Sequence, residues 1–235
     1  MTERLPEKVA PAEGPRQMSS ELAPVKLDAT NVRRFLRALT GMGVNTYVFD
    51  KRDAPTLGKL RKVARLCTRC DLARTRKTVV FGEGDPKAQL VFVGEAPGED
   101  EDAQGRPFVG RAGKLLDQLI GRTGLRRSQV YICNVLKCRP PGNRDPEPTE
   151  IEACKEYLLA QLSLIKPRVI CTLGRHAYNT LLGVDERITR VRGVLTKYHG
   201  ITLLPAYHPS FLLRNQGKIK EAWEDMETLK KLLSA

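Results

Sequence analysis

The feature that most constrains the fold is an apolar run, Leu90 to Val93, that leads directly into the turn Gly94-Glu-Ala-Pro-Gly98. A run without polar alternation suits a strand buried on both faces, as in a parallel sheet covered by helices. The two glycines permit a sharp bend and a close approach to a ligand, and Pro97 fixes the turn. Because open α/β sheets bind ligands past the carboxyl ends of their strands, the stretch predicts a binding loop. An ordinary strand-to-helix connection would have the same pattern.

The rest of the chain repeats this order of strand and helix. Further strands are expected at residues 130–136, 169–173 and 202–206. Helices are expected at 112–123, from a cap at Thr149, after Gly174-Arg-His176 through Leu182, and at 218–233 with Trp223 facing inward. The alternation predicts an α/β fold with a central four-stranded parallel sheet flanked by helices. Parallel strands end at one edge of a sheet, so Glu95, Asn134 and His208, each just past or at a strand end, are expected to converge.

The chain before this domain is polar and basic. Residues 1–27 lack apolar periodicity and are predicted to be a flexible tail. Residues 28–65 are predicted to be a basic helical extension, with helices at 28–39 and 56–65, and residues 66–235 the main domain. Ten Lys and Arg against two Asp between residues 51 and 77 supply +8 of the net charge of +13. This concentration favours a partner with phosphates, either nucleic acid or an anionic membrane, although a solvated basic helix is equally compatible with it.

No apolar run approaches the ~18 residues of a membrane span, and the N-terminus has no apolar centre typical of a signal peptide. We therefore expect a cytoplasmic protein that does not enter a membrane, and a monomer.

Six cysteines in such a chain are not expected to form structural disulfides. Two pairs, Cys67-x-x-Cys70 and Cys138 with Cys154, have the character of metal ligands, whereas Cys133 and Cys171 stand in apolar, strand-like contexts. Four thiolates from two distant segments bind either zinc or an iron–sulfur cluster, and the spacing does not choose between them.

Several side chains near the predicted sheet edge suit recognition of a base in a nucleic acid. The Asn134 amide offers both a donor and an acceptor, the pair needed to read a pyrimidine-like edge. Phe108 is a candidate stacking platform, although such a residue more often belongs to the core. After His208-Pro209, candidate DNA contacts are a phosphate site at Ser210, a wedge at Leu212 or Leu213, and a second phosphate contact at Arg214.

Four motifs together resemble the family four uracil-DNA glycosylases. They are Gly94–Gly98, Gly105-Arg-Pro-Phe-Val-Gly-Arg-Ala-Gly113, Asn134-Val-Leu-Lys-Cys-Arg-Pro-Pro-Gly-Asn-Arg-Asp145 and His208-Pro-Ser-Phe-Leu-Leu-Arg214. The resemblance covers residues 66–233 and implies an enzyme that flips uracil out of DNA, hydrolyses its N-glycosidic bond and leaves an abasic site. It also implies a [4Fe–4S] cluster on Cys67, Cys70, Cys138 and Cys154.

The resemblance further implies roles for single residues. Gly94, Glu95 and Ala96 would line the uracil pocket, Phe108 would stack on the base, Asn134 would read its edge, and His208 would donate to O2 of the leaving uracil. Arg139 and Arg144 are expected to contact DNA. Ala96 stands where some relatives have a water-orienting Asp, so that role is expected to fall to Glu101, with Glu95 as the alternative. A different reading is an iron–sulfur accessory protein that binds nucleic acid without excising a base.

Overall fold

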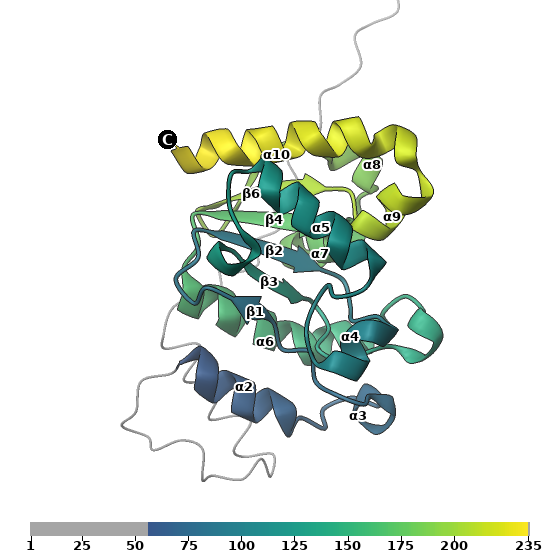
Figure 1. Cartoon of the computed structure of the whole chain (residues 1–235). Coiled ribbons are helices and arrows are strands. Elements are labelled where there is room, and N and C mark those ends of the chain that lie inside the picture. Colours follow the sequence, from purple (N-terminus) through teal and green to yellow (C-terminus); the bar gives the residue numbers. More distant parts are fainter. Residues whose placement is uncertain (1–55, 235) are drawn as a thin grey trace, which may run out of the picture.

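The computed structural model of the chain describes residues 56–234, so the predicted tail at 1–27 and the predicted helix at 28–39 lie outside the described residues. A six-stranded sheet with the order β1-β3-β2-β4-β6-β5 forms the centre (Figure 1). The strands are β1 (Glu83–Gly84), β2 (Leu90–Gly94), β3 (Tyr131–Asn134), β4 (Val169–Leu173), β5 (Thr196–Tyr198) and β6 (Ile201–Ala206).

The predicted α/β class and the four parallel strands are confirmed, because β3, β2, β4 and β6 pair in parallel. The sequence prediction missed β1 and β5, which add antiparallel edges to β3 and β6. Strands of two and three residues are too short to carry a periodic signal.

Helices cover both faces of the sheet (Figure 1). They are α2 (Leu57–Arg65), α3 (Leu72–Thr75), α4 (Glu99–Gln104), α5 (Arg111–Arg122), α6 (Pro148–Ile165), α7 (Arg175–Leu182), α8 (Ile188–Val191), α9 (Pro209–Arg214) and α10 (Ile219–Ser234). Val91 and Val93 of β2 pack into the core shared with α2, α6 and α7, whereas Leu90 and Phe92 pack into the core shared with α5 and α10. Burial on both faces explains why the strand is apolar throughout.

The N-terminus of α6 corrects one prediction. The cap is Glu147 rather than Thr149, because Pro148 occupies the first helical position, where its missing N–H costs no hydrogen bond. The carboxylate of Glu150 accepts from the Glu147 N–H at 2.9 Å. The segment between β3 and α6 contains a 3₁₀ turn at Pro141–Asn143.

Trp223 of α10 was predicted to face the core, and this is wrong. Its side chain is 38% exposed and lies against the guanidinium of Arg122, 4.1 Å from the ring centroid. The buried stripe of α10 runs instead along Ala222, Met226 and Leu229. A large ring that stacks on a cation gains an attractive contact without entering the core.

Helix α2, on the N-terminal side of the predicted boundary at residue 66, packs against the main domain. Thr56 caps it by accepting from the Lys59 N–H at 3.2 Å, and Leu60, Val63 and Ala64 are buried in the core that includes α6. The boundary itself stays a prediction. None of the described helices is long and apolar enough to cross a membrane.

The packing of α2 predicts how much the extension contributes to stability. Leu60→Ala removes a fully buried side chain and should lower the free energy of unfolding by about 2–5 kcal/mol. Lys62→Ala, on the exposed face of the same helix, should change it by less than about 0.5 kcal/mol. Chemical denaturation followed by circular dichroism measures both; equal stability of the two variants would show that α2 is not part of the cooperative unit.

Candidate functional site

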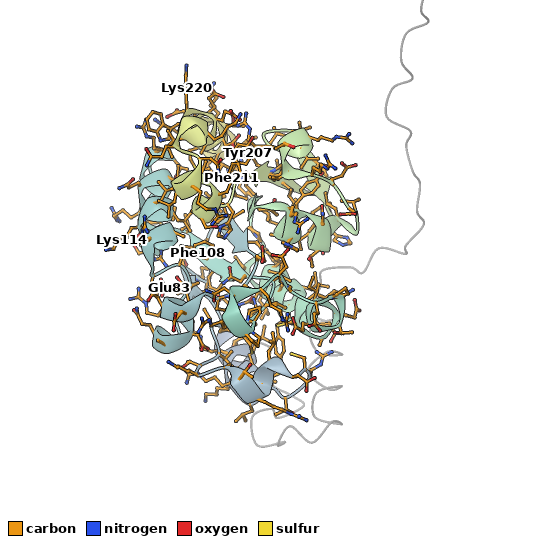
Figure 2. The ribbon with its side chains drawn as sticks, turned by 90° about the vertical axis from the view of Figure 1, so that its right-hand side faces the viewer. Glu83, Phe108, Lys114, Tyr207, Phe211 and Lys220 are labelled. Carbon is orange, nitrogen blue, oxygen red and sulfur yellow. The ribbon has the colours of Figure 1, made fainter. Side chains whose placement is uncertain are left out.

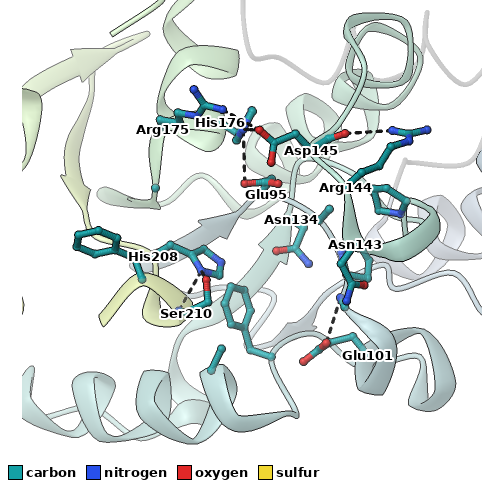
Figure 3. Close-up of a pocket in the computed structure, with 18 of the residues that line it drawn as sticks. Glu95, Glu101, Asn134, Asn143, Arg144, Asp145, Arg175, His176, His208 and Ser210 are labelled. Carbon is teal, nitrogen blue, oxygen red and sulfur yellow. Dashed lines mark hydrogen bonds and ion pairs between the residues drawn. The ribbon is translucent and has the colours of Figure 1, made fainter. Parts of the chain in front are cut away.

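A pocket of about 530 Å³ opens at the carboxyl ends of the parallel strands (Figure 3). The predicted convergence is present, since Glu95, Asn134 and His208 all line this pocket. Of the other sequence-predicted residues, those that line it are Ala96, Glu101, Phe108, Arg144, Ser210 and Arg214. Gly94, Arg139, Leu212 and Leu213 are not among the lining residues.

Asn134 ends β3 and is 1% exposed, opposite Gly94 in the parallel register. Its Oδ1 atom is buried and accepts no hydrogen bond from any described residue. A Cβ atom at position 94 would collide with that oxygen and with the Phe108 ring. The missing side chain of Gly94 lets the amide and the ring approach the same point of the pocket wall, and contact of Gly94 itself with a base stays a prediction.

Phe108 lies in the left-handed backbone region, with φ of 51°, and its loop is held by Glu101. The Glu101 carboxylate accepts from the backbone N–H groups of Val109 at 2.8 Å, Gly110 at 3.1 Å and Gly98 at 3.1 Å. One carboxylate thus joins the Gly94–Gly98 turn to the loop that carries the aromatic ring. This anchoring offsets the cost of an uncommon backbone conformation at Phe108.

His208 caps α9 and faces Phe108, with ring centroids 5.6 Å apart. Its Nδ1 accepts from the Ser210 N–H at 3.1 Å and lies 2.7 Å from the Ser210 Oγ. Desolvation by the surrounding protein, and then the Arg214 guanidinium, lower the pKa of His208 to about 4. The imidazole is therefore neutral at pH 7, and because Nδ1 is the acceptor, Nε2 carries the hydrogen.

The structure corrects the predicted DNA contacts on α9. Leu212 is 1% exposed and packs in the core, so it cannot enter a base stack, which leaves the half-buried Leu213 of the two predicted wedges. Ser210 is engaged with His208, and its role as a phosphate contact stays a prediction. Arg214 is exposed at the rim of the pocket.

Arg144 and Arg139 are both held by side chains of their own surroundings. Arg144 makes a two-pronged pair with the buried Glu150, at 2.9 and 2.6 Å, and the pair lowers the pKa of that carboxyl. Arg139 donates to the Asn143 Oδ1 at 2.7 Å. These contacts fix the shape of the 139–148 loop, while direct contact with DNA stays a prediction for both.

Sequence reasoning missed a second group of charged residues in the pocket wall. His176 Nε2 lies 3.3 Å from the Asp145 Oδ2 and 3.8 Å from the Glu95 Oε2, and Arg175 donates to Asp145 at 2.7 Å (Figure 3). The pKa of Glu95 is raised overall. Desolvation raises it most, His176 opposes the rise, and Asp145 adds to it. The sequence did contain a signal for His176. Gly174-Arg-His176 follows the strand predicted at 169–173, which places His176 at the same sheet edge as Asn134.

Aromatic side chains were also missed. Tyr207 and Phe211 line the pocket and lie on the same face as Phe108 (Figure 2), with their ring centroids 4.9 Å apart. The sequence contained them next to His208, but nothing in their spacing distinguishes pocket aromatics from core aromatics.

The four predicted ligand cysteines come together beside the loop that connects β3 to α6. Their sulfurs influence one another's ionisation, and burial raises the pKa of Cys138 to about 11 and of Cys154 to about 12. Cys138 Sγ receives a hydrogen bond from the Arg76 guanidinium and Cys154 Sγ one from the Lys137 N–H, both at 3.3 Å. Cys133 and Cys171 are fully buried in the two cores.

Comparison with known proteins follows the same motifs. Residues 81–232 match the family model described as uracil DNA glycosylase superfamily. The chain is 48% identical over 171 residues to the type-4 uracil-DNA glycosylase of Thermotoga maritima, covering 71% of this chain and 89% of that protein. It is 47% identical over 186 residues to the type-4 uracil-DNA glycosylase of Sulfurisphaera tokodaii, covering 75% of this chain and 84% of that protein.

A more distant relative is a much longer protein. A DNA polymerase of Bacillus phage SP01 is 32% identical over 154 residues, which are 65% of this chain and 16% of the polymerase. The family match over most of the chain, the strong similarity to type-4 enzymes and a pocket at the predicted sheet edge agree with one another. The chain belongs to the uracil-DNA glycosylase superfamily.

Proposed function

We propose that this protein hydrolyses the N-glycosidic bond of deoxyuridine in DNA, releases uracil and leaves an abasic site. The names of its type-4 relatives support this activity. The observation that carries the proposal is the Asn134 amide, a buried polar group with an unpaired oxygen in the wall of a pocket that has room for a base. A buried acceptor without a partner costs free energy, and a ligand that supplies a donor recovers it.

Uracil presents an N3–H donor beside a carbonyl acceptor, and the Asn134 amide complements this pair. Cytosine presents the opposite arrangement at the same edge and would leave buried groups unpaired, so the site should reject it strongly. Phe108, held beside Gly94, would stack on the face of the flipped base.

His208 would stabilise the leaving group. As the bond breaks, negative charge builds on uracil, and a neutral imidazole with hydrogen on Nε2 is able to donate to its O2 atom. Ser210 fixes that tautomer by donating its backbone N–H to Nδ1. A donor already in place gives more stabilisation than one that must reorganise, typically about 10²–10³ in rate.

The contacts favour Glu95 over Glu101 as the group that orients the attacking water. Both oxygens of Glu101 already accept hydrogen bonds from backbone amides. Glu95 follows β2 directly and borders the pocket, and its raised pKa brings it closer to that of a useful general base. Glu101 then serves the reaction by holding the loop of Phe108.

The cysteine set fits the iron–sulfur cluster implied by the resemblance better than one zinc ion. Around zinc, with bonds of about 2.3 Å, four sulfurs would lie within about 4 Å of one another. Among the described residues, no three of these sulfurs lie within 4.8 Å of one another. The three potential ligand atoms that do lie so close belong to Glu95, Asp145 and His176. Cys67, Cys70, Cys138 and Cys154 would hold the cluster, whose role is structural because base excision transfers no electrons.

Base release provides the direct test of the proposed activity. Wild-type protein should produce alkali-labile sites in oligonucleotides that contain U·G, U·A or single-stranded U, and Asn134→Ala should lower kcat/KM by about 10²–10³. Asn179→Ala, outside this pocket, is the matched control. Retained DNA binding without base release in the wild type would support the accessory-protein alternative instead.

The assignment of the water-orienting group predicts two distinguishable variants. Glu95→Gln should lower kcat by about 10²-fold or more with little change in KM or in stability, because the amide cannot accept a proton from water. Glu101→Gln should raise KM and lower the free energy of unfolding, because it weakens the acceptor of three backbone amides. Steady-state kinetics and thermal unfolding separate them; the reverse pattern would return the role to Glu101.

The cluster assignment predicts a spectroscopic change. Purified protein should absorb near ~400 nm, and Cys138→Ser should lose this absorption together with stability and DNA affinity. Cys171→Ser, at a buried thiol of the opposite core, should keep the absorption. A Cys138→Ser protein that is stable, fully active and unchanged in colour would contradict the assignment.

A further inference from the structure

Of the charged group around His176, the chemistry described so far uses Glu95 alone and gives no role to His176, Asp145 or Arg175. The group joins three separate segments: Glu95 follows β2, Asp145 lies in the 139–148 loop and His176 is in the first turn of α7. The side chains are 30%, 67% and 20% exposed, respectively. All three border the pocket, and His176 lies between the two carboxylates (Figure 3).

The two carboxylates differ in the contacts that hold them. The outer carboxylate, Asp145, receives a hydrogen bond from Arg175 at 2.7 Å on the same oxygen that faces His176. Among the described residues, the ion-pair partner of the inner carboxylate, Glu95, is His176 at 3.8 Å. The same nitrogen therefore faces both carboxylates: the Asp145 oxygen, which Arg175 fixes, lies nearer at 3.3 Å, and the oxygen of Glu95, to which we assign the water, lies farther at 3.8 Å.

We propose that His176 is a positioning residue, which Asp145 and Arg175 hold in place so that its Nε2 orients and stabilises the Glu95 carboxylate in the pocket. This inference rests on the proposed glycosylase function. A single imidazole nitrogen between a fixed carboxylate and a reactive one ties the position of the second to the first, which suits holding one geometry through the reaction.

The same three ligand atoms lie within 4.8 Å of one another, which also suits a cation. Arg175 argues against that reading, because its guanidinium donates to the Asp145 oxygen that a cation would need. A fixed positive group at this distance repels a divalent ion. The positioning role uses every contact that is present, including that of Arg175.

The charged groups around Glu95 shift its pKa in opposite directions, and each shift is testable. From α7, His176 and Arg175 favour the ionised carboxylate, and from the 139–148 loop Asp145 disfavours it. Further charged or titratable groups that border the pocket are Glu101 on α4, Arg144 in the loop, Tyr207 and His208 before α9, and Arg214 on α9. Loss of His176 should therefore raise the pKa of Glu95, and loss of the Asp145 charge should lower it.

The experiment compares pH profiles of uracil release and the titration of Glu95 itself. In His176→Leu, the acidic limb of kcat/KM should move to higher pH by about 0.5–1 unit, and in Asp145→Asn to lower pH by a similar amount. At the alkaline plateau, His176→Leu should lower kcat about 10-fold with KM unchanged. His176→Gln, which keeps an N–H donor near the Nε2 position, should recover most of that plateau rate.

Matched controls use residues of the same type outside the group. His199→Asn, in the turn between β5 and β6, and Asp185→Asn, after α7, should leave both limb and plateau unchanged. The carboxyl ¹³C shift of Glu95, titrated in full-length protein without DNA, should show the same two opposite pKa shifts. This second readout does not depend on activity.

The two proposals fail in different ways. A Glu95 titration that does not move in either variant, or that moves in the same direction in both, overturns the role of His176 even if the wild type releases uracil. Opposite shifts of Glu95 in a protein that releases no uracil would support the electrostatic arrangement and overturn the proposed function.

Discussion

The close approach of Gly94 to Asn134 and Phe108 is the contact on which the rest of the site depends. Strands β2 and β3 pair in parallel register, which places position 94 directly opposite Asn134. Because any side chain there would collide with both partners, only glycine allows the amide and the aromatic ring to share one wall. Glu101 anchors both sides of this contact, because it accepts from one backbone amide of the turn and from two of the loop that carries Phe108.

The pocket and the cysteine set are connected through the end of β3. Lys137, which is almost fully buried, donates from Nζ to the Asn134 carbonyl and to the Gln161 side chain, each at 2.6 Å. Its backbone N–H donates to the Cys154 sulfur. Burial lowers the pKa of this lysine, while the neighbouring thiols raise it. Lys137 thus supports Asn134 from the side on which the cysteines lie.

The surroundings shift the pKa values of two pocket residues in opposite directions. On one side, desolvation and Arg214 keep His208 neutral, which suits a donor to a developing anion. On the other, desolvation and Asp145 raise the pKa of Glu95, which suits a group that takes part in proton transfer. Environments that move titratable groups in different directions are how one small site holds a donor and a base at the same pH.

The sequence by itself determined the four parallel strands and the placing of Asn134 and His208 at their carboxyl ends, where the pocket lies, because these follow from apolar runs and from the parallel order of the strands. Only the tertiary structure decided that Leu212 is buried, that Trp223 stacks on Arg122, that α2 joins the core and that His176 lies between two carboxylates. These outcomes depend on which side chains of distant segments face one another. The packing of the helices on the sheet decides which side chains meet, and a pattern within one segment contains no information about that packing.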